Sequence, residues 1–300
     1  MSPQKKISIF LFLTFTFSLF SYVPIIRAGT LGVNDGLFVL TMMWSPGLAA
    51  LLTQFIATRS LRGLGWHIRS VRWLGIAFIL PVVYGLPVYA FTWLTGLGMF
   101  PNPSRIATLA EKYASSNVIA TLATFLLISL TIDMVGPLIS ALGEEIGWRG
   151  LFVPELAKMT SFTKTALISG VVWAAWHMPA IFLADYNSGV TPPVYGAIFF
   201  TVTITAISFP FAWLTLKSGS LWPAVLLHAI HNQFIQGIFD YLTGKTAITP
   251  YIIGEFGIGM ALTSLVVAFV FWRMGLDHFA GRDDANSQNV KPSTASPANI

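Results

Sequence analysis

The sequence predicts an all-α fold: a polytopic bundle of about eight transmembrane helices with a polar cavity open to the cytoplasmic side. Of its 300 residues, 55% are hydrophobic and only 10% are charged, whereas soluble domains carry about 25% charged residues. The mean hydropathy is +0.71. Apolar runs of about 20 residues, long enough to cross a bilayer, recur along the whole chain.

Short polar loops separate these runs. The expected spans are 7–26, 37–58, 73–94, 118–142, 165–183, 194–216, 221–239 and 251–272. Two lysines precede the first span, which is longer than the hydrophobic region of a usual signal peptide, although a cleaved signal remains an alternative there. The expected divisions are N-terminal transmembrane helices with a basic cytoplasmic loop (1–117), a membrane core (118–275) and a disordered cytoplasmic tail (276–300).

The distribution of basic residues predicts the orientation. With eight spans both termini lie on the same side, and 13 of the 17 Lys and Arg residues would lie there too. Because cytoplasmic loops are enriched in Lys and Arg, we expect both termini in the cytoplasm. The basic residues form no stripe with interleaved aromatics, so the net charge of +5 does not indicate a nucleic-acid partner.

Two adjacent carboxylates, Glu144 and Glu145, stand at the end of the fourth apolar run. Charged groups are costly beside lipid and usually functional there. Glu145 and Arg149 are four residues apart and can pair on a helix. Glu144 points about 100° away from Glu145, which leaves it free to face another group.

Two later spans carry histidines. In one, Trp173 precedes His177 by four residues; in the other, His228 and Asn232 share a helix face, with His231 beside them. Polar groups within apolar helices usually face the bundle interior, so one shared site is the economical interpretation.

This residue set suits the attack of water on a carbonyl group. A carboxylate can take the proton, an imidazole can orient the water, and Asn or His donors can stabilise the oxyanion. A metal-assisted alternative would place zinc on Glu144, His177 and His228, and it stays open because the sequence does not decide it. The chain has no cysteine, so thiolate ligands are excluded.

In their order and spacing, the three motifs resemble the CPBP intramembrane proteases, which include type II CAAX prenyl endopeptidases and bacteriocin self-immunity proteins. The resemblance covers about residues 118–235 and makes 118–275 the catalytic core. It implies that Glu144 is the general base and His177 its partner, while His228 and Asn232 form the oxyanion site. Glu145 and Arg149 would hold the helix end, and Trp173 would supply an aromatic contact where many members have phenylalanine.

The expected function is therefore endoproteolysis of a membrane-associated protein or peptide, including prenylated CAAX-type substrates. We expect the plasma membrane of a bacterium or archaeon as its location. A non-catalytic immunity or scaffold protein of the same family is the alternative, and a transporter is less well supported because no internal repeat is present. The roles of Asp133 and His231 stay open.

Overall fold

Long apolar helices dominate the structure, a computed structural model that describes residues 1–187 and 191–289. Within these residues six helical segments are long and apolar enough to cross a membrane. Many large apolar side chains on them are exposed, including Phe12, Phe20 and Val266, as expected where lipid covers the surface. The protein is an all-α polytopic membrane bundle.

The six long segments are α1 (Pro3–Ala28), α2 (Leu37–Thr58) with the preceding short helix η1 (Val33–Gly36), α3 (Val71–Leu94), α8 (Phe162–Leu183), α9 (Pro193–Ser218) and the first part of α12 (Ile258–Asn289). The shorter helices are α4 (Pro103–Lys112), α5 (Val118–Ser129), α6 (Val135–Glu145), α7 (Val153–Leu156), α10 (Trp222–His231) and α11 (Thr249–Ile252). Two π-helices, η2 (Ile146–Phe152) and η3 (Asn232–Asp240), continue α6 and α10.

Three of the eight expected spans are built from shorter pieces, and one of them, 251–272, is interrupted between α11 and α12. The run 221–239 is helical throughout, but it changes from α to π geometry at Asn232. The run 118–142 is interrupted by turns between α5 and α6. At this break the Thr131 hydroxyl donates to the Leu127 carbonyl, 2.6 Å away, and such back-bonding competes with regular helix. Asp133 lies exposed in the break.

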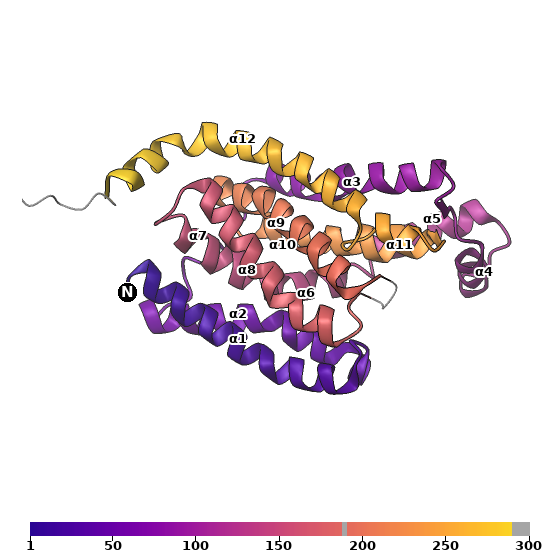
Figure 1. Cartoon of the computed structure of the whole chain (residues 1–300), viewed down its shortest axis with the longest axis horizontal. Coiled ribbons are helices and arrows are strands. Elements are labelled where there is room, and N and C mark those ends of the chain that lie inside the picture. Colours follow the sequence, from indigo (N-terminus) through magenta and orange to yellow (C-terminus); the bar gives the residue numbers. More distant parts are fainter. Residues whose placement is uncertain (188–190, 290–300) are drawn as a thin grey trace, which may run out of the picture.

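The N-terminus and the end of α12 lie at the same end of the bundle (Figure 1). At the other end, α4 and α5 lie beside a two-stranded antiparallel sheet of β1 (Gly98–Met99) and β2 (Gly244–Lys245). α12 remains helical to Asn289, so the tail expected from 276 is helical at its start; its residues contain no proline before Pro292. Residues 290–300 lie outside the described residues. Helices from both sides of residue 117 pack together, as α2 does on α6 and α3 on α10.

The helices α6 and η2 pack closely against α2, backbone to backbone. A Cβ added at Gly47 would overlap the backbone carbonyl of Gly143, and one added at Gly147 would lie 2.6 Å from Pro46. Small residues at such crossings let membrane helices approach closely. The contact fixes the position of the helix end that carries Glu144 and Glu145.

An ion pair also ties the N-terminal helix to this region. Glu155 in α7 accepts hydrogen bonds from Lys6 at 2.9 Å and from Lys158 at 2.8 Å. Burial by itself raises the pKa of the Glu155 carboxyl, but the hydrogen bonds from the two lysines outweigh it, so that this pKa is lowered. Glu155 therefore stays ionised and holds α1 against the segment that follows the motif.

We predict that Gly47→Leu lowers the free energy of unfolding by about 1–3 kcal/mol, because the new side chain must push α2 away from α6. Thermal unfolding of the purified protein in detergent would measure this loss. Gly75→Leu is the matched control, since a side chain at Gly75 meets nothing within 4 Å. Equal midpoints for the two variants would contradict the close contact.

Candidate active site

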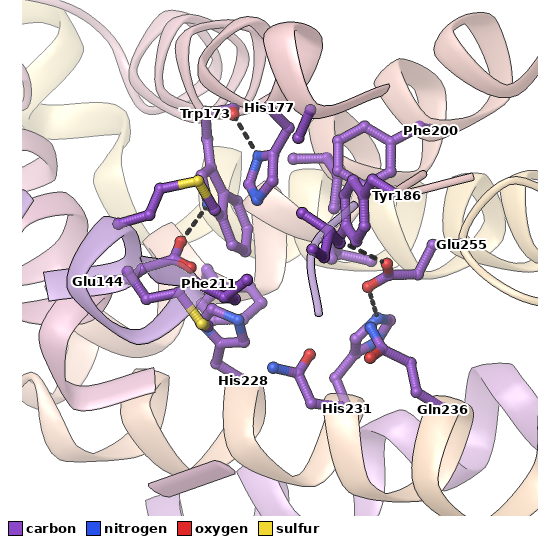
Figure 2. A pocket seen from close by; sticks show the side chains of 18 residues that line it. Glu144, Trp173, His177, Tyr186, Phe200, Phe211, His228, His231, Gln236 and Glu255 are labelled. Atoms are coloured by element: carbon purple, nitrogen blue, oxygen red, sulfur yellow. Dashed lines mark hydrogen bonds and ion pairs between the residues drawn. The ribbon is translucent and has the colours of Figure 1, made fainter. Parts of the chain in front are cut away.

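The three motifs expected to meet do line one cavity, of about 190 Å³ (Figure 2). Its wall is drawn from α2, α6, α8, α9, α10, η3 and the connections before α2, after α8 and between α11 and α12. Among the residues singled out from the sequence, those on the wall are Glu144, Trp173, His177, His228, His231 and Asn232.

Glu144 lies at the end of α6 and is 1% exposed. Its Oε2 accepts hydrogen bonds from two indole N–H groups, that of Trp173 at 2.7 Å and that of Trp148 at 3.3 Å. No other described side chain hydrogen-bonds the carboxylate, which leaves Oε1 without a donor. One oxygen thus fixes the orientation of the group, and the other remains free to accept a proton.

Glu145 forms the buried pair expected with Arg149. The Arg149 Nη1 donates to both carboxylate oxygens, at 2.9 and 3.1 Å. His228 Nδ1 lies 2.9 Å from Glu145 Oε1. Because a carboxylate only accepts, Nδ1 carries the proton. The His228 ring is therefore oriented by Glu145, a second role for this residue that spacing along one helix does not show.

Arg149 is also enclosed by aromatic rings. Its guanidinium carbon lies 4.1 Å from the ring centroids of both Trp173 and Phe211. Contact with an aromatic face stabilises a desolvated cation. The positive charge of Arg149 is balanced by Glu145, and the two rings lie against the guanidinium group.

His177 has a defined tautomer. Its Nδ1 lies 2.9 Å from the backbone carbonyl oxygen of Trp173 and must donate to it, so the lone pair of the neutral ring is on Nε2. The ring stacks on Tyr186 with centroids 5.8 Å apart and also contacts Trp176 and Phe200. It can accept a hydrogen bond in the cavity.

Asn232, the first residue of η3, is partly buried on the same wall. Its amide makes no hydrogen bond to any described group. Together with the ring of His228, one turn earlier, it is placed to contact a ligand in the cavity.

Comparison with known proteins matches the segment that carries the three motifs. Residues 124–234 match the family described as type II CAAX prenyl endopeptidase Rce1-like. The chain is also similar to a protein of Methanococcus maripaludis named CAAX prenyl protease 2, with 30% identity over 102 residues. Over these residues the chain is similar to the type II CAAX prenyl endopeptidases. That alignment covers 32% of this chain and 36% of the relative, so the chain spans about a third of the relative's length.

The facing wall of the cavity holds a carboxylate that the sequence analysis missed. Glu255, between α11 and α12, accepts from Tyr186 at 3.0 Å, and its Oε1 lies 2.8 Å from His231 Nε2. His231 Nδ1 in turn lies 2.5 Å from the Tyr84 hydroxyl. Figure 2 shows Glu255 and His231 across from Glu144. In the sequence, the only sign of this site was that Glu255 is the single acidic residue of the expected span 251–272.

The cavity extends away from the termini. Leu31, between α1 and α2, and Tyr186, just after α8, belong to connections at the opposite end of the bundle, and both line it. On the side of the termini, the residues that follow Glu144 and Glu145 are buried; Trp148, Arg149 and Phe152 are each 1% exposed. The expected opening of the cavity to the cytoplasmic side stays a prediction.

Asp133, whose role the sequence left open, does not line this cavity. It lies in the break between α5 and α6, where its side chain is exposed.

The zinc alternative requires Glu144, His177 and His228 as ligands. No three His, Asp or Glu side chains in the described part of the chain are grouped closely enough to hold a metal ion. The indoles occupy only one oxygen of Glu144, and each histidine donates through Nδ1, which leaves Glu144 Oε1 and the two Nε2 atoms available. We derive no step through a metal.

We predict that Glu145→Ala lowers the free energy of unfolding by about 3–5 kcal/mol, because it leaves the Arg149 guanidinium buried without a countercharge. Thermal unfolding in detergent would measure the change, with the exposed Glu111→Ala as control. The double variant Glu145→Gln with Arg149→Met should lose less than Glu145→Ala. A single variant as stable as the control would refute the structural role of the pair.

Proposed function

We propose that this protein is an intramembrane endopeptidase that hydrolyses a peptide bond of a membrane-associated protein or peptide, with prenylated CAAX-type proteins as the substrate class. One observation carries the proposal. Glu144, held through one oxygen, shares a cavity of about 190 Å³ with His177, His228 and Asn232.

The reaction follows from these groups. Glu144 Oε1 takes a proton from water, whose oxygen bonds to the carbonyl carbon of the substrate. The Nε2 lone pair of His177 accepts the second hydrogen of that water and orients it. Asn232 donates to the resulting oxyanion, and His228 joins it through Nε2 when its ring is doubly protonated, with Glu145 as countercharge. The C–N bond then breaks, and Glu144 returns the proton to the leaving nitrogen.

The shape of the cavity agrees with a lipid-bearing substrate. Its volume of about 190 Å³ is below the 300–1,000 Å³ usual for a whole small-molecule ligand, so it would admit the reacting bond and its closest groups. The wall beside the polar residues is apolar, with Val39, Met42, Met43, Ile204 and Phe211. The rest of the substrate would extend along the membrane-facing surface. CAAX specificity is proposed from the family and from the name of the similar archaeal protein.

We predict that Glu144→Gln lowers kcat by about 10²–10⁴-fold, the usual contribution of a general base, since the amide cannot take the proton from water. The assay would follow cleavage of a prenylated CAAX peptide by protein reconstituted in liposomes. Glu111→Gln is the matched control, and a chelator should leave cleavage by the unaltered protein unchanged.

Full turnover by Glu144→Gln would contradict the proposed base. Absence of cleavage by the unaltered, folded protein would favour the non-catalytic immunity or scaffold function. Loss of cleavage with chelator, restored by added zinc, would contradict the metal-free mechanism.

A further inference from the structure

A second cavity, of about 940 Å³, lies at the end of the bundle that carries the termini. It is enclosed by the loop between α2 and α3, by η2 and α7, and by the turn between α9 and α10. The basic residues on its wall are Arg62, His67, Arg69, Arg149 and Lys158, and no Asp or Glu lines it.

The positive charge of this cavity is only partly neutralised. Lys158 pairs with Glu155 and Arg149 with Glu145. The Arg62 and Arg69 side chains have no hydrogen bond or ion pair with any other residue that the structure describes. Arg69 lies over Gly219, where an added Cβ would be 3.5 Å from its guanidinium. Two guanidinium groups therefore remain available to an anion.

The loop that carries these arginines is held in place by three hydrogen bonds. The Gln54 amide donates to the Arg62 carbonyl at 2.7 Å, and the Trp222 indole donates to the Trp66 carbonyl at 2.7 Å. The backbone N–H of Leu221 donates to the Gly65 carbonyl at 2.9 Å. A cavity that is already formed before its ligand binds loses less conformational entropy on binding.

A buried cation contributes to the wall nearest the active site. Arg149 is 1% exposed, and its Nε has no hydrogen-bond partner among the described residues. Gly150 lets the loop approach, since an added Cβ would lie 3.1 Å from the Leu64 carbonyl oxygen. The cavity thus combines a desolvated charge with two exposed arginines.

Apolar side chains on the same loop indicate where the ligand comes from. Leu61, Ile68 and Val71 are 45%, 57% and 75% exposed, and Trp66 lines the cavity. Tryptophans and exposed aliphatic groups beside arginines are typical of the boundary between lipid tails and headgroups. Water-soluble anions would not need these apolar neighbours.

We propose that this cavity binds the phosphate-bearing headgroup of an acidic membrane lipid, with Arg62 and Arg69 as the main phosphate contacts. Planar guanidinium groups bind phosphate oxygens in pairs, which makes arginine well suited to this chemistry. The proposal is independent of the proteolytic function. It also differs from general attraction of basic loops to anionic membranes, because it requires two particular arginines of the four between residues 59 and 72.

The test measures binding of short-chain phosphatidic acid to the full-length protein in neutral detergent, by native mass spectrometry. The variant Arg62→Ala with Arg69→Ala removes the proposed contacts. Arg59→Ala with Arg72→Ala removes the same charge at the first residue of the loop and in the first turn of α3, from side chains that instead lie against the rings of Phe55 and Trp73. Arg62→Lys with Arg69→Lys keeps the charge, and thermal unfolding checks that all variants fold.

We expect the Arg62/Arg69 alanine variant to bind phosphatidic acid at least about tenfold more weakly, a loss of about 1.4 kcal/mol, while the Arg59/Arg72 variant binds as the unaltered protein does. The lysine variant should be intermediate, and phosphatidylcholine should bind weakly throughout. Inorganic phosphate, tested alone, should bind more weakly than the lipid. Equal losses in the two alanine variants, no loss in either, or inorganic phosphate binding as tightly as the lipid would overturn the proposal.

Discussion

The buried ion pair between Glu145 and Arg149 is the constraint on which the arrangement of this site depends. Both side chains are at most 1% exposed, and charges in such surroundings persist only when paired and hydrogen-bonded. The pair uses both oxygens of Glu145 and still leaves one of them in contact with His228. Satisfying the charges at one helix end therefore also positions an imidazole from another helix.

Trp173 connects this pair to the proposed base. Its indole N–H holds Glu144, its ring face lies against Arg149, and its backbone carbonyl fixes the tautomer of His177. Its ring also contacts that of His228 at 5.3 Å between centroids. Trp173 thus contacts groups on α6, α8 and α10. The glycine contacts with α2 hold α6 and η2 in position.

The sequence predicted the parts of this site that depend on spacing within one helix. Scarce charge and helical periodicity identified Glu144, the Glu145–Arg149 pair and the histidine helices, and the order of the motifs indicated the family that residues 124–234 resemble. Glu255 was missed because its partners, Tyr186 and His231, come from elements far away in the sequence. The break near Asp133 and the direction of the cavity depend on packing at the bundle ends, which hydropathy does not report.

The ion pair of Glu145 and Arg149 connects the two cavities. Arg149 lines the basic cavity, while its partner Glu145 contacts His228 on the proposed catalytic cavity. The two cavities extend towards opposite ends of the bundle from this residue pair. If the termini are cytoplasmic, as the basic residues predict, the basic cavity faces the cytoplasmic headgroups.

The central claim is that Glu144 and its partners share a cavity that water can enter. The chain has no cysteine, so single cysteines can be probed directly with a small water-soluble thiol reagent on reconstituted protein. Asn232→Cys lies on the cavity wall, and Leu227→Cys, at 0% exposed, is its buried control on the preceding helix. The account predicts rapid modification of the cysteine at 232 and none at 227; a cysteine at 232 as inert as that at 227 would contradict it.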